Sequence, residues 1–425
     1  MKPHHHQDHP LKELNILPKT QRSSVLTLSV TLILITIACL YFSLPTPFSI
    51  PSPPPVDTKC DVFTGEWIPD PNAMYYTNNT CSAIHEHQNC MKYGRPDTDF
   101  LRWWWKPKGC NLPRFDPEEF LSVVRGKSIA FIGDSVGRNQ MQSLICLLSK
   151  TVSPNLIAET KIRDQTHSTW YYPTSNFTLS NFWSPFLLIA SEANPTSPSP
   201  IGLFHIHLDH PDPAWTAHLS RFDYLIFSAG HWFFRPLMLY NTTTTTTTIS
   251  CSNCKDNNIT HISVYDAYRL AFRSTFSALK GFKGTAFLRT FSPSHFEGGV
   301  WDNGGDCVRT RPFKAEEGRL EWFQGEMYRA QVEELRAAAE RESGGVRFGL
   351  LDVTAAMSMR PDGHPGRYGR PKNETKYNDC VHWCLPGPVD VWNGFLLHLL
   401  KVEEARIVVR SAISDAVRLR GTICG

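Results

Sequence analysis

The chain has little net charge, no internal repeat and no convincing metal-ligand pattern. Charged residues make up 20% of its 425 residues and the formal net charge is only +3, so no chain-wide field favours nucleic acid or an acidic partner. Repeats at solenoid or propeller periods are absent. The Cys251–Cys254 spacing has no paired histidine ligands, which makes it a weak zinc signal. We therefore expect a non-repetitive protein without a metal and without a nucleic-acid partner.

Charge is missing altogether from Ser23 to Val56, and Val25 to Leu44 is an almost continuous apolar run. A run of this length can cross about 30 Å of hydrocarbon. Basic residues precede it and none follows before Lys59, which places the N-terminus in the cytosol and the rest in a lumen. A cleaved signal peptide is the alternative, but the run is longer than a usual signal-peptide core and lacks a clean cleavage site. The predicted segments are a cytosolic tail (1–23), a transmembrane signal anchor (24–44) and a Pro-rich stem (45–59).

Cysteines and glycosylation sequons both agree with a lumenal location. Of the 12 cysteines, only Cys39 lies in the apolar run, and the other eleven follow it; this density suits an oxidising compartment. Because eleven is odd, one thiol is unpaired or pairs elsewhere. The N-glycosylation sequons also follow the run, and they begin at Asn78, Asn176, Asn241, Asn258 and Asn373.

After the stem, the chain changes character near residue 116. Residues 60–115 are rich in Cys, Trp and Gly without sustained periodicity and predict a disulfide-rich subdomain. Residues 116–425 alternate apolar strands with amphipathic helices, which predicts an α/β domain with a mostly parallel sheet flanked by helices. Two low-complexity stretches, 191–200 and Thr242–Thr248, are expected to be surface loops. The expected strands are Ser128–Ile132, Tyr224–Ser228, Thr285–Arg289 and Arg347–Asp352, and the expected helices include Val264–Leu279 and Arg319–Arg341.

The sharpest chemical signal is the segment SIAFIGDSVGRNQ, in which an apolar strand ends at Gly133, Asp134 and Ser135 and a helix follows. In a parallel sheet the ligand crevice lies beyond the carboxyl ends of the strands, so the hydroxyl of Ser135 is expected to be exposed there. Gly133 permits the tight turn, and amides at the helix start can receive an oxyanion. An Asp-Ser pair before a helix is also an ordinary helix cap, so the serine needs a second signal.

That signal lies near the C-terminus, in the segment YNDCVHWCLPGPVDVWN. A serine hydroxyl is a poor nucleophile unless a base accepts its proton. Asp379 and His382 are three residues apart, a spacing that lets the carboxylate reach Nδ1 while Nε2 faces the serine. Cys380 and Cys384 flank them, so disulfides can fix the loop. The sequence therefore predicts a triad of Ser135, His382 and Asp379.

Four blocks in this order resemble the plant trichome-birefringence-like family, whose PC-esterase domain belongs to the SGNH/GDSL esterase superfamily. The blocks are CDVFTGEW (Cys60–Trp67), FIGDS (Phe131–Ser135), FLRTFSPSHFEGGVWDNGGDC (Phe287–Cys307) and DCVHWCLPGPVDVWN (Asp379–Asn393). The resemblance implies an SGNH-like fold and a Golgi polysaccharide O-acetyltransferase, a single-pass type II membrane protein with its catalytic domain in the lumen. It also implies Ser135 as nucleophile, His382 as base and Asp379 as its orienting partner. The stretch Tyr75–Pro117 is most similar to the branch that acetylates galactose in xyloglucan side chains.

The same resemblance implies disulfides and binding groups. The implied pairs are Cys60 with Cys110, Cys81 with Cys146, Cys90 with Cys384 and Cys307 with Cys380. Cys251, Cys254 and Cys424 stay unassigned, although the first two can close on each other. Gly133 and Gly230 are the expected oxyanion glycines, while no third-block asparagine of the superfamily is evident. The expected substrate contacts, each of which follows a predicted strand, are Trp232, Arg289, His295 and Trp301.

The expected reaction is a double displacement through an acetyl-serine, with no bound cofactor and with acetyl-CoA or an acetylated intermediate as the acetyl donor. The expected partners are a cell-wall polysaccharide, the Golgi membrane and membrane proteins that supply acetyl groups. Three alternatives stay open: acetylation of xylan, mannan or pectin, an acetylesterase that uses the same triad with water, and a non-catalytic wall-glycan binding protein. Sugar and water would attack the same acyl-enzyme, so the sequence does not separate transfer from hydrolysis.

Overall fold

The structure is a computed structural model that describes residues 60–162, 165–194, 202–242, 247–255, 258–314, 317, 320–341, 345–374 and 377–423. The chain divides into a compact unit, Val56–Glu404, and a second group that contains Ala405–Gly425. The predicted tail, membrane anchor and stem lie outside the described residues, as do Cys39 and Cys424. Among the residues that are described, no helix is both long enough and apolar enough to cross a membrane.

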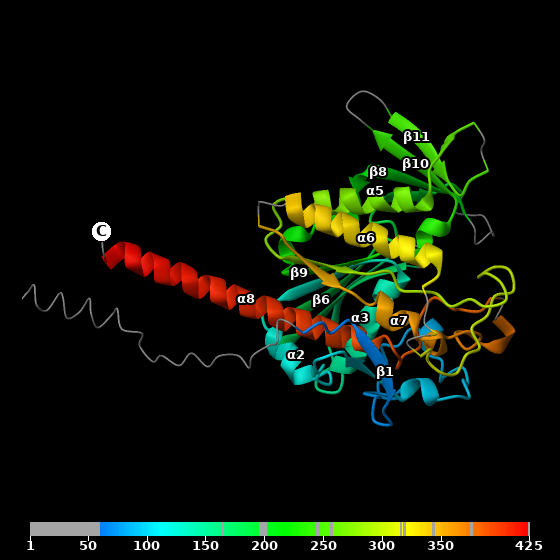
Figure 1. Cartoon of the computed structure of the whole chain (residues 1–425), viewed down its shortest axis with the longest axis horizontal. Helices are drawn as coiled ribbons and strands as arrows, with labels where there is room; N and C mark the ends of the chain where they lie inside the picture. The colour runs from blue at the N-terminus through cyan, green and yellow to red at the C-terminus, as the bar shows by residue number, and fades with distance from the viewer. Residues whose placement is uncertain are drawn as a thin grey trace, which may run out of the picture. The chain divides into compact units, whose positions relative to one another are not determined.

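A seven-stranded sheet with the order β14-β13-β9-β3-β6-β5-β4 forms the centre of the compact unit (Figure 1). The strands from β14 to β6 are parallel, and β5 and β4 continue the sheet in antiparallel pairing. Its members are β3 (Ser128–Gly133), β4 (Asn155–Ile162), β5 (Gln165–Tyr172), β6 (Phe177–Trp183), β9 (Tyr224–Ser228), β13 (Thr285–Arg289) and β14 (Arg347–Leu351). The four strands predicted from apolar runs are all present, and each end lies within one residue of the prediction.

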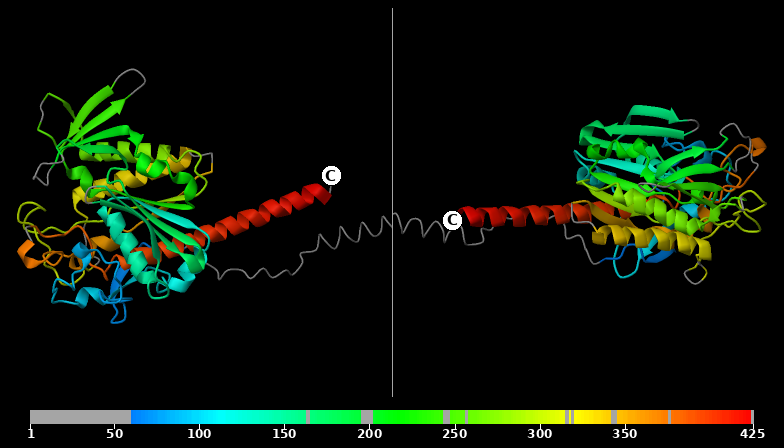
Figure 2. Two further views of the ribbon diagram at one scale, coloured as in Figure 1. Left: turned by 180° about the vertical axis from the view of Figure 1, so that it is seen from behind. Right: turned by 90° about the horizontal axis from the view of Figure 1, so that it is seen from above.

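Helices cover both faces of this sheet. The side chains of a strand alternate between the two faces, so neighbouring residues of one strand join different hydrophobic cores. In β3, Ile129 and Phe131 join a hydrophobic core with α3 (Ser135–Leu148) and the start of α8 (Asp390–Ile423). Ala130 and Ile132 join a second core with α5 (Val264–Ser277) and α6 (Trp322–Arg341), which lie side by side in Figures 1 and 2. Within the described residues, the remaining α-helices are α2 (Pro117–Val123), α4 (Pro213–Thr216) and α7 (Thr354–Ser358).

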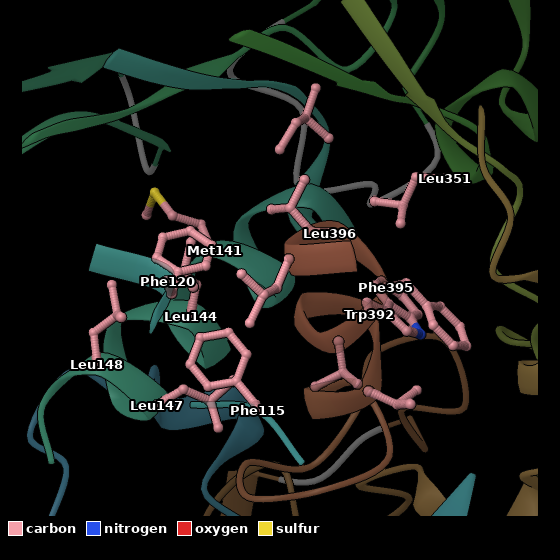
Figure 3. Close-up of a cluster of buried hydrophobic side chains, with 14 of the residues drawn as sticks. Phe115, Phe120, Met141, Leu144, Leu147, Leu148, Leu351, Trp392, Phe395 and Leu396 are labelled. Carbon is pink, nitrogen blue, oxygen red and sulfur yellow. The ribbon is translucent and has the colours of Figure 1, made fainter. Parts of the chain in front are cut away.

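The first core fixes the helix that begins at Ser135. Figure 3 shows Met141 and Leu144 of α3 on one side of this core and Trp392 and Leu396 of α8 on the other. All four side chains are 2% exposed or less. Burial of one such side chain stabilises the fold by about 1.5–3 kcal/mol, so α3 cannot move on the sheet without a large loss of stability.

A second sheet, with the order β12-β11-β10-β8-β7, was not predicted. Its strands are β7 (Leu188–Glu192), β8 (Phe204–Pro211), β10 (Leu237–Thr242), β11 (Thr247–Ser252) and β12 (Thr260–His261). The two predicted surface loops are therefore wrong in part: residues 191–192 belong to β7, and Thr242 pairs with Thr247 in the β10–β11 hairpin. A strand ladder is built by main-chain groups and threonine is β-branched, so a shortage of apolar side chains did not exclude strands here.

The Cys-rich N-terminal region contains one small antiparallel sheet of β1 (Gly65–Pro69) and β2 (Trp103–Pro107). Trp105 is fully buried and donates a hydrogen bond from its indole N–H to the carbonyl of Val62 at 2.8 Å. The rest is held by short 3-10 turns, at Glu86–Gln88 and Asp99–Leu101, and by disulfides. Further 3-10 turns lie at Pro173–Ser175, Leu219–Arg221, His231–Phe234, Pro361–Gly363 and Lys372–Glu374. The prediction of a disulfide-rich N-terminal region beside a mixed α/β fold is confirmed.

Candidate active site

Ser135 begins α3 directly after β3, at the carboxyl edge of the parallel strands. From β3 the sheet continues to β6 on one side and to β9 on the other. A position where the strand order reverses in this way opens a crevice for a ligand at the carboxyl ends of the strands. Ser135 is partly exposed at this point, although its neighbours Asp134 and Val136 are buried.

Gly133 allows β3 to run unusually close to β9. Its φ is +152°, and a Cβ atom at this position would lie 1.6 Å from the main-chain oxygen of Ser228. At Gly137 in α3, a Cβ atom would lie 2.3 Å from Oγ of the same serine. A side chain at either position would push the end of β9 away from the start of α3, so these glycines set the position of Ser135 through packing.

Asp134 caps the helix of Ser135. Its Oδ1 accepts hydrogen bonds from the amides of Val136 at 3.0 Å and Gly137 at 3.4 Å, which leaves these two amides engaged. Nη2 of Arg289 lies 4.0 Å from the same oxygen, and both side chains are only 2% exposed. Burial lowers the pKa of Arg289, against the attraction of Asp134. Arg289, which was expected to contact substrate, is thus buried beside the carboxylate that caps the helix.

The structure brings the three side chains of the predicted triad together. Ser135 Oγ lies 2.6 Å from Nε2 of His382, whose Nδ1 lies 2.8 Å from Oδ2 of Asp379. The other carboxylate oxygen accepts hydrogen bonds from the amides of Val381 at 3.2 Å and His382 at 3.0 Å. With a proton on Nδ1 facing the carboxylate, Nε2 is left as the acceptor for the hydroxyl proton. The arrangement can activate Ser135 as a nucleophile.

Asp379 and His382 each stabilise the charged form of the other. Burial raises the pKa of the Asp379 carboxyl, but the attraction of His382 and the hydrogen bonds that it accepts leave that pKa well below its ordinary value. Burial lowers the pKa of His382, but the charge and hydrogen bond of Asp379 raise it above its ordinary value. His382 is therefore a stronger base than an isolated imidazole.

Five disulfides are present among the described residues, and two of them hold the loop of the triad. Cys380 is joined to Cys307 and Cys384 is joined to Cys90, so covalent bonds leave the loop on both sides of His382. The other pairs are Cys60–Cys110, Cys81–Cys146 and Cys251–Cys254. The first four pairs are the same as those that the family resemblance implied.

Helix α3 also holds this loop directly. Asn139 lies one turn beyond Ser135, and its Oδ1 accepts the amide of Trp383 at 2.8 Å while its Nδ2 donates to the carbonyl of Trp383 at 3.3 Å. Gly366 pairs with Asp379 in an antiparallel bridge with N···O distances of 2.8 and 3.0 Å. The helix that carries the hydroxyl therefore also sets the position of the base.

The other predicted residues after β9 are mostly parts of the protein interior. Gly230 lies two residues beyond β9, and a Cβ atom there would meet the ring of Phe291 at 2.7 Å. Trp232 is partly buried, and the guanidinium of Arg235 lies 4.1 Å from its ring centroid. The aromatic neighbours of Trp232 are Trp183, Phe186 and Phe204.

His295 and Trp301 lie in different surroundings. Nδ1 of His295 is 2.7 Å from Nε2 of His364, so its ring is bonded within the protein. Trp301 is 38% exposed, and its ring lies 5.8 Å from the ring of Tyr377, which is 37% exposed and precedes Asp379 by two residues. Of the four residues that were expected to contact substrate, Trp301 offers the largest open surface.

The sequence analysis missed several charged or titratable neighbours of the triad. Arg138 lies one helical turn after Ser135, and its charge lowers the pKa of His382. His231 follows Gly230 and donates from Nε2 to the carbonyl of Ser292 at 2.9 Å; burial lowers its pKa to about 4. The i+3 spacing from the serine is a signal that could have identified Arg138. No local pattern marks His231.

One group of potential metal ligands occurs within the described ranges, formed by Cys251, Cys254 and His261. Parallel pairing of β11 with β12 sets Cys251 opposite His261. The two cysteines are joined to each other, and a disulfide sulfur does not offer the thiolate that a metal requires. The group lies on the second sheet and contributes no residue to the triad.

Residues 112–399 match the PC-esterase family, described as the GDSL/SGNH-like acyl-esterase family found in Pmr5 and Cas1p, and residues 58–111 match the PMR5 N-terminal domain. Protein trichome birefringence-like 20 of Arabidopsis thaliana is 50% identical over 356 residues, which cover 82% of this chain and 73% of that protein. The chain belongs to the trichome birefringence-like branch of the PC-esterase family. The PC-esterase region contains all three residues of the triad.

Other relatives carry the name of an enzyme. Xyloglucan O-acetyltransferase 4 of Populus trichocarpa is 44% identical over 352 residues, which cover 81% of this chain and 82% of that protein. Xyloglucan O-acetyltransferase 2 of Arabidopsis thaliana is 42% identical over 353 residues, which cover 82% of this chain and 84% of that protein. The family that the four sequence blocks resembled is therefore confirmed.

Proposed function

We propose that this chain is an O-acetyltransferase that transfers acetyl groups to plant cell-wall polysaccharide through an acetyl-serine at Ser135, with galactose in xyloglucan side chains as the acceptor. One observation carries the proposal: an unbroken chain of contacts runs from Asp379 through His382 to the Ser135 hydroxyl, at 2.8 and 2.6 Å. The choice of acceptor is supported by the names of relatives at 42–44% identity.

In the first half of the reaction, His382 Nε2 removes the hydroxyl proton of Ser135 as Oγ attacks the acetyl carbonyl of the donor. The donor is acetyl-CoA or an acetylated intermediate supplied by a membrane protein. The protonated His382 then gives its proton to the leaving group, and an acetyl ester remains on Ser135. Because Asp134 engages the amides of Val136 and Gly137, the oxyanion relies on the amides of Ser135 and Gly230, at the ends of neighbouring strands.

In the second half, His382 removes a proton from a sugar hydroxyl, which attacks the acetyl-serine and releases Ser135. General-base help of this kind contributes on the order of 10²–10⁴-fold. The exposed pair of Trp301 and Tyr377 is the proposed contact for a pyranose ring of the acceptor, because sugar rings pack on aromatic faces and Tyr377 lies two residues before Asp379.

The proposed location is the Golgi membrane, with one transmembrane segment at 24–44 and the catalytic domain in the lumen. Support comes from the five disulfides, which suit an oxidising compartment, and from sequon residues that reach the surface, such as Asn176 and Asn373. A protease-protection assay on sealed microsomes tests this. The catalytic domain should survive protease until detergent is added, and digestion without detergent would refute the topology.

The enzymatic proposal is tested with full-length protein in detergent, acetyl-labelled CoA and a panel of oligosaccharides from xyloglucan, xylan, mannan and pectin. Label should reach galactosylated xyloglucan oligosaccharide in preference to the others, and Ser135→Ala should abolish transfer while the protein still folds and is glycosylated. An active Ser135→Ala protein would overturn the mechanism. Preferential labelling of another glycan would overturn the choice of acceptor only.

A second candidate, an acetylesterase, is favoured by the description of the matched family as acyl-esterases. Water in place of the sugar hydroxyl would release acetate from the same acetyl-serine. The labelled assay separates the two, because hydrolysis yields free acetate whether or not oligosaccharide is present. A ratio of acetate to acetylated glycan that stays high at saturating oligosaccharide would favour the esterase.

A further inference from the structure

The carbonyl of His382 has a hydrogen-bond partner of its own, in addition to the contacts that hold its neighbours. Nδ1 of His364 lies 2.7 Å from this oxygen. His364 is 2% exposed, and its ring stacks on Trp383 with the centroids 4.0 Å apart and the planes at 26°. The ring is thus packed between the loop of the triad and the protein interior, where it has little freedom to turn.

The hydrogen-bond partners determine which ring nitrogens carry protons. A carbonyl oxygen only accepts, so Nδ1 of His364 must carry a proton, and Nε2 of the neutral ring is then an acceptor. That Nε2 lies 2.7 Å from Nδ1 of His295, which must therefore donate. The remaining nitrogen of His295 lies 3.2 Å from the carbonyl of Ser358, the longest of the three contacts; in the neutral ring this nitrogen carries no proton, so it makes no hydrogen bond to that carbonyl.

Burial and nearby charges keep both rings neutral. Burial lowers the pKa of His295 to about 4; the Ser358 carbonyl and the charge of Glu297 oppose this, and the charge of Arg309 adds to it. Burial also lowers the pKa of His364, well below its ordinary value, and the charges of His295 and Arg95 act in the same direction. The direction of the two short hydrogen bonds, from His295 to His364 and from His364 to His382, is therefore fixed at neutral pH.

We propose that His295 and His364 are positioning residues that form a directed hydrogen-bond relay, and that this relay fixes the main chain of His382 so that its ring points at Ser135. The inference rests on the proposed function, because it assigns the relay to the orientation of that triad. Asp379 then restrains the ring of His382 from one side, and His364 restrains its main chain from the other. His295 acts by holding His364 in the tautomer that donates to His382.

Two variants of His364 separate positioning from folding. His364→Leu fills the buried position with an apolar side chain and removes the hydrogen-bond donor. His364→Asn instead offers an amide N–H close to the place of Nδ1. Misplacement of a catalytic group by about 1 Å can cost on the order of 100-fold, so we expect His364→Leu to lower kcat by about 10- to 100-fold with little change in KM for oligosaccharide. His364→Asn should recover most of that loss.

The control is His205→Leu, which removes a ring bonded to the Tyr240 hydroxyl at 2.8 Å in the second sheet; its kcat should equal that of the wild type. His295→Phe should lower kcat in the same direction as His364→Leu, and the double variant should be no worse than His364→Leu alone, because both changes break one relay. Additive losses would overturn the relay.

The decisive readout is the rate at which a serine-directed acylating reagent labels Ser135 in the full-length protein. Fast labelling of the wild type with slow labelling of His364→Leu and restored labelling of His364→Asn is expected. Equal rates for wild type and His364→Leu would overturn the inference and leave the proposed function standing. A wild-type protein that is not labelled at Ser135 would instead overturn the proposed function.

Discussion

Ser135 and His382 are in contact, but the two segments that carry them are built differently. Ser135 belongs to a strand, a turn and a helix, and its position follows from the close approach of β3 to β9 at Gly133 and from the cap at Asp134. The loop of Asp379 and His382 contains no helix or strand within the described ranges. It is held by disulfides to distant parts of the chain, by Asn139 and by His364.

The two halves of the site therefore depend on different forces. The half with Ser135 is fixed by local main-chain geometry, and it should persist as long as the sheet and α3 are packed. The half with His382 is fixed by single long-range contacts, each of which can be removed without unfolding the sheet. Changes to the hydrogen-bonding side chains of the loop should therefore affect catalysis more than stability, whereas loss of a loop disulfide and changes at the start of α3 should affect stability as well.

The largest expected effect in the loop comes from Asp379→Asn. The amide no longer favours a proton on Nδ1 of His382, so Nε2 ceases to be a reliable acceptor, and kcat should fall by about 10⁴-fold with only a small change in thermal stability. Steady-state kinetics and a melting curve check this. Asp209→Asn, which breaks a hydrogen bond to His210 at 2.9 Å outside the site, should keep the wild-type kcat. A loss within tenfold for Asp379→Asn would contradict the triad.

The next largest effect should come from the disulfide between Cys90 and Cys384. These cysteines are 294 residues apart in the sequence, whereas Cys251 and Cys254 are 3 apart, and longer closed loops give more stabilisation in the chain-entropy account. Replacement of the first pair by serine should cost about 2–5 kcal/mol of unfolding free energy and lower kcat, while replacement of the second pair should cost less and leave kcat unchanged. Equal losses of unfolding free energy for the two pairs in denaturant titrations would show that the loop disulfide has no special role.

At the start of α3, Asp134→Ala should cost about 2 kcal/mol, the upper end of the range for a helix cap, because the buried Arg289 also loses its neighbouring carboxylate. The matched control is Asp116→Ala at the start of α2, where the carboxylate accepts amides at 2.8 and 3.2 Å and a loss of about 1 kcal/mol is expected. Chemical denaturation of both variants measures the difference. A smaller loss for Asp134→Ala than for Asp116→Ala would show that Arg289 does not depend on this carboxylate.

The smallest effect concerns pH. The reaction needs neutral His382, and the pKa of this ring is raised above its ordinary value by Asp379 in spite of burial. The acid limb of kcat/KM should therefore rise with pH and level off only above the ordinary histidine pKa. The residual activity of Asp379→Asn should have its inflection at a lower pH, because the carboxylate no longer raises the pKa of His382. A pH profile of hydrolysis of a small acetyl ester checks both, and an unmoved inflection would mean that a different group titrates.

Much of the nucleophile half could be predicted from sequence because its determinants are local. The apolar run Ser128–Ile132, the glycine and the helical pattern that follows are adjacent in the chain, and β3 and α3 form where they were expected. For the loop half, the spacing of Asp379 and His382 was sufficient to predict the pair. The contact of His382 with Ser135, 247 residues away, was inferred from chemistry and from family resemblance. No local sequence pattern predicts a contact between residues so far apart.

The errors arise where the environment of a side chain depends on packing between distant segments. Arg289 ends β13 and His295 follows this strand, but both turn into the protein rather than toward an open crevice. No sequence pattern marks His364, because its contact with His382 is to a main-chain carbonyl. The threonine run Thr242–Thr248 was expected to be a loop because it carries no apolar pattern, but Thr242 and Thr247 pair at the end of the β10–β11 hairpin.

The most direct test of the account is intact-protein and peptide mass spectrometry of the full-length protein after brief exposure to an acetyl donor without oligosaccharide. We expect one added acetyl group on the peptide that contains Ser135, its loss on addition of the acceptor oligosaccharide, and no such group in Ser135→Ala. Transfer of acetyl to the glycan by a protein that never carries the group on Ser135 would contradict it.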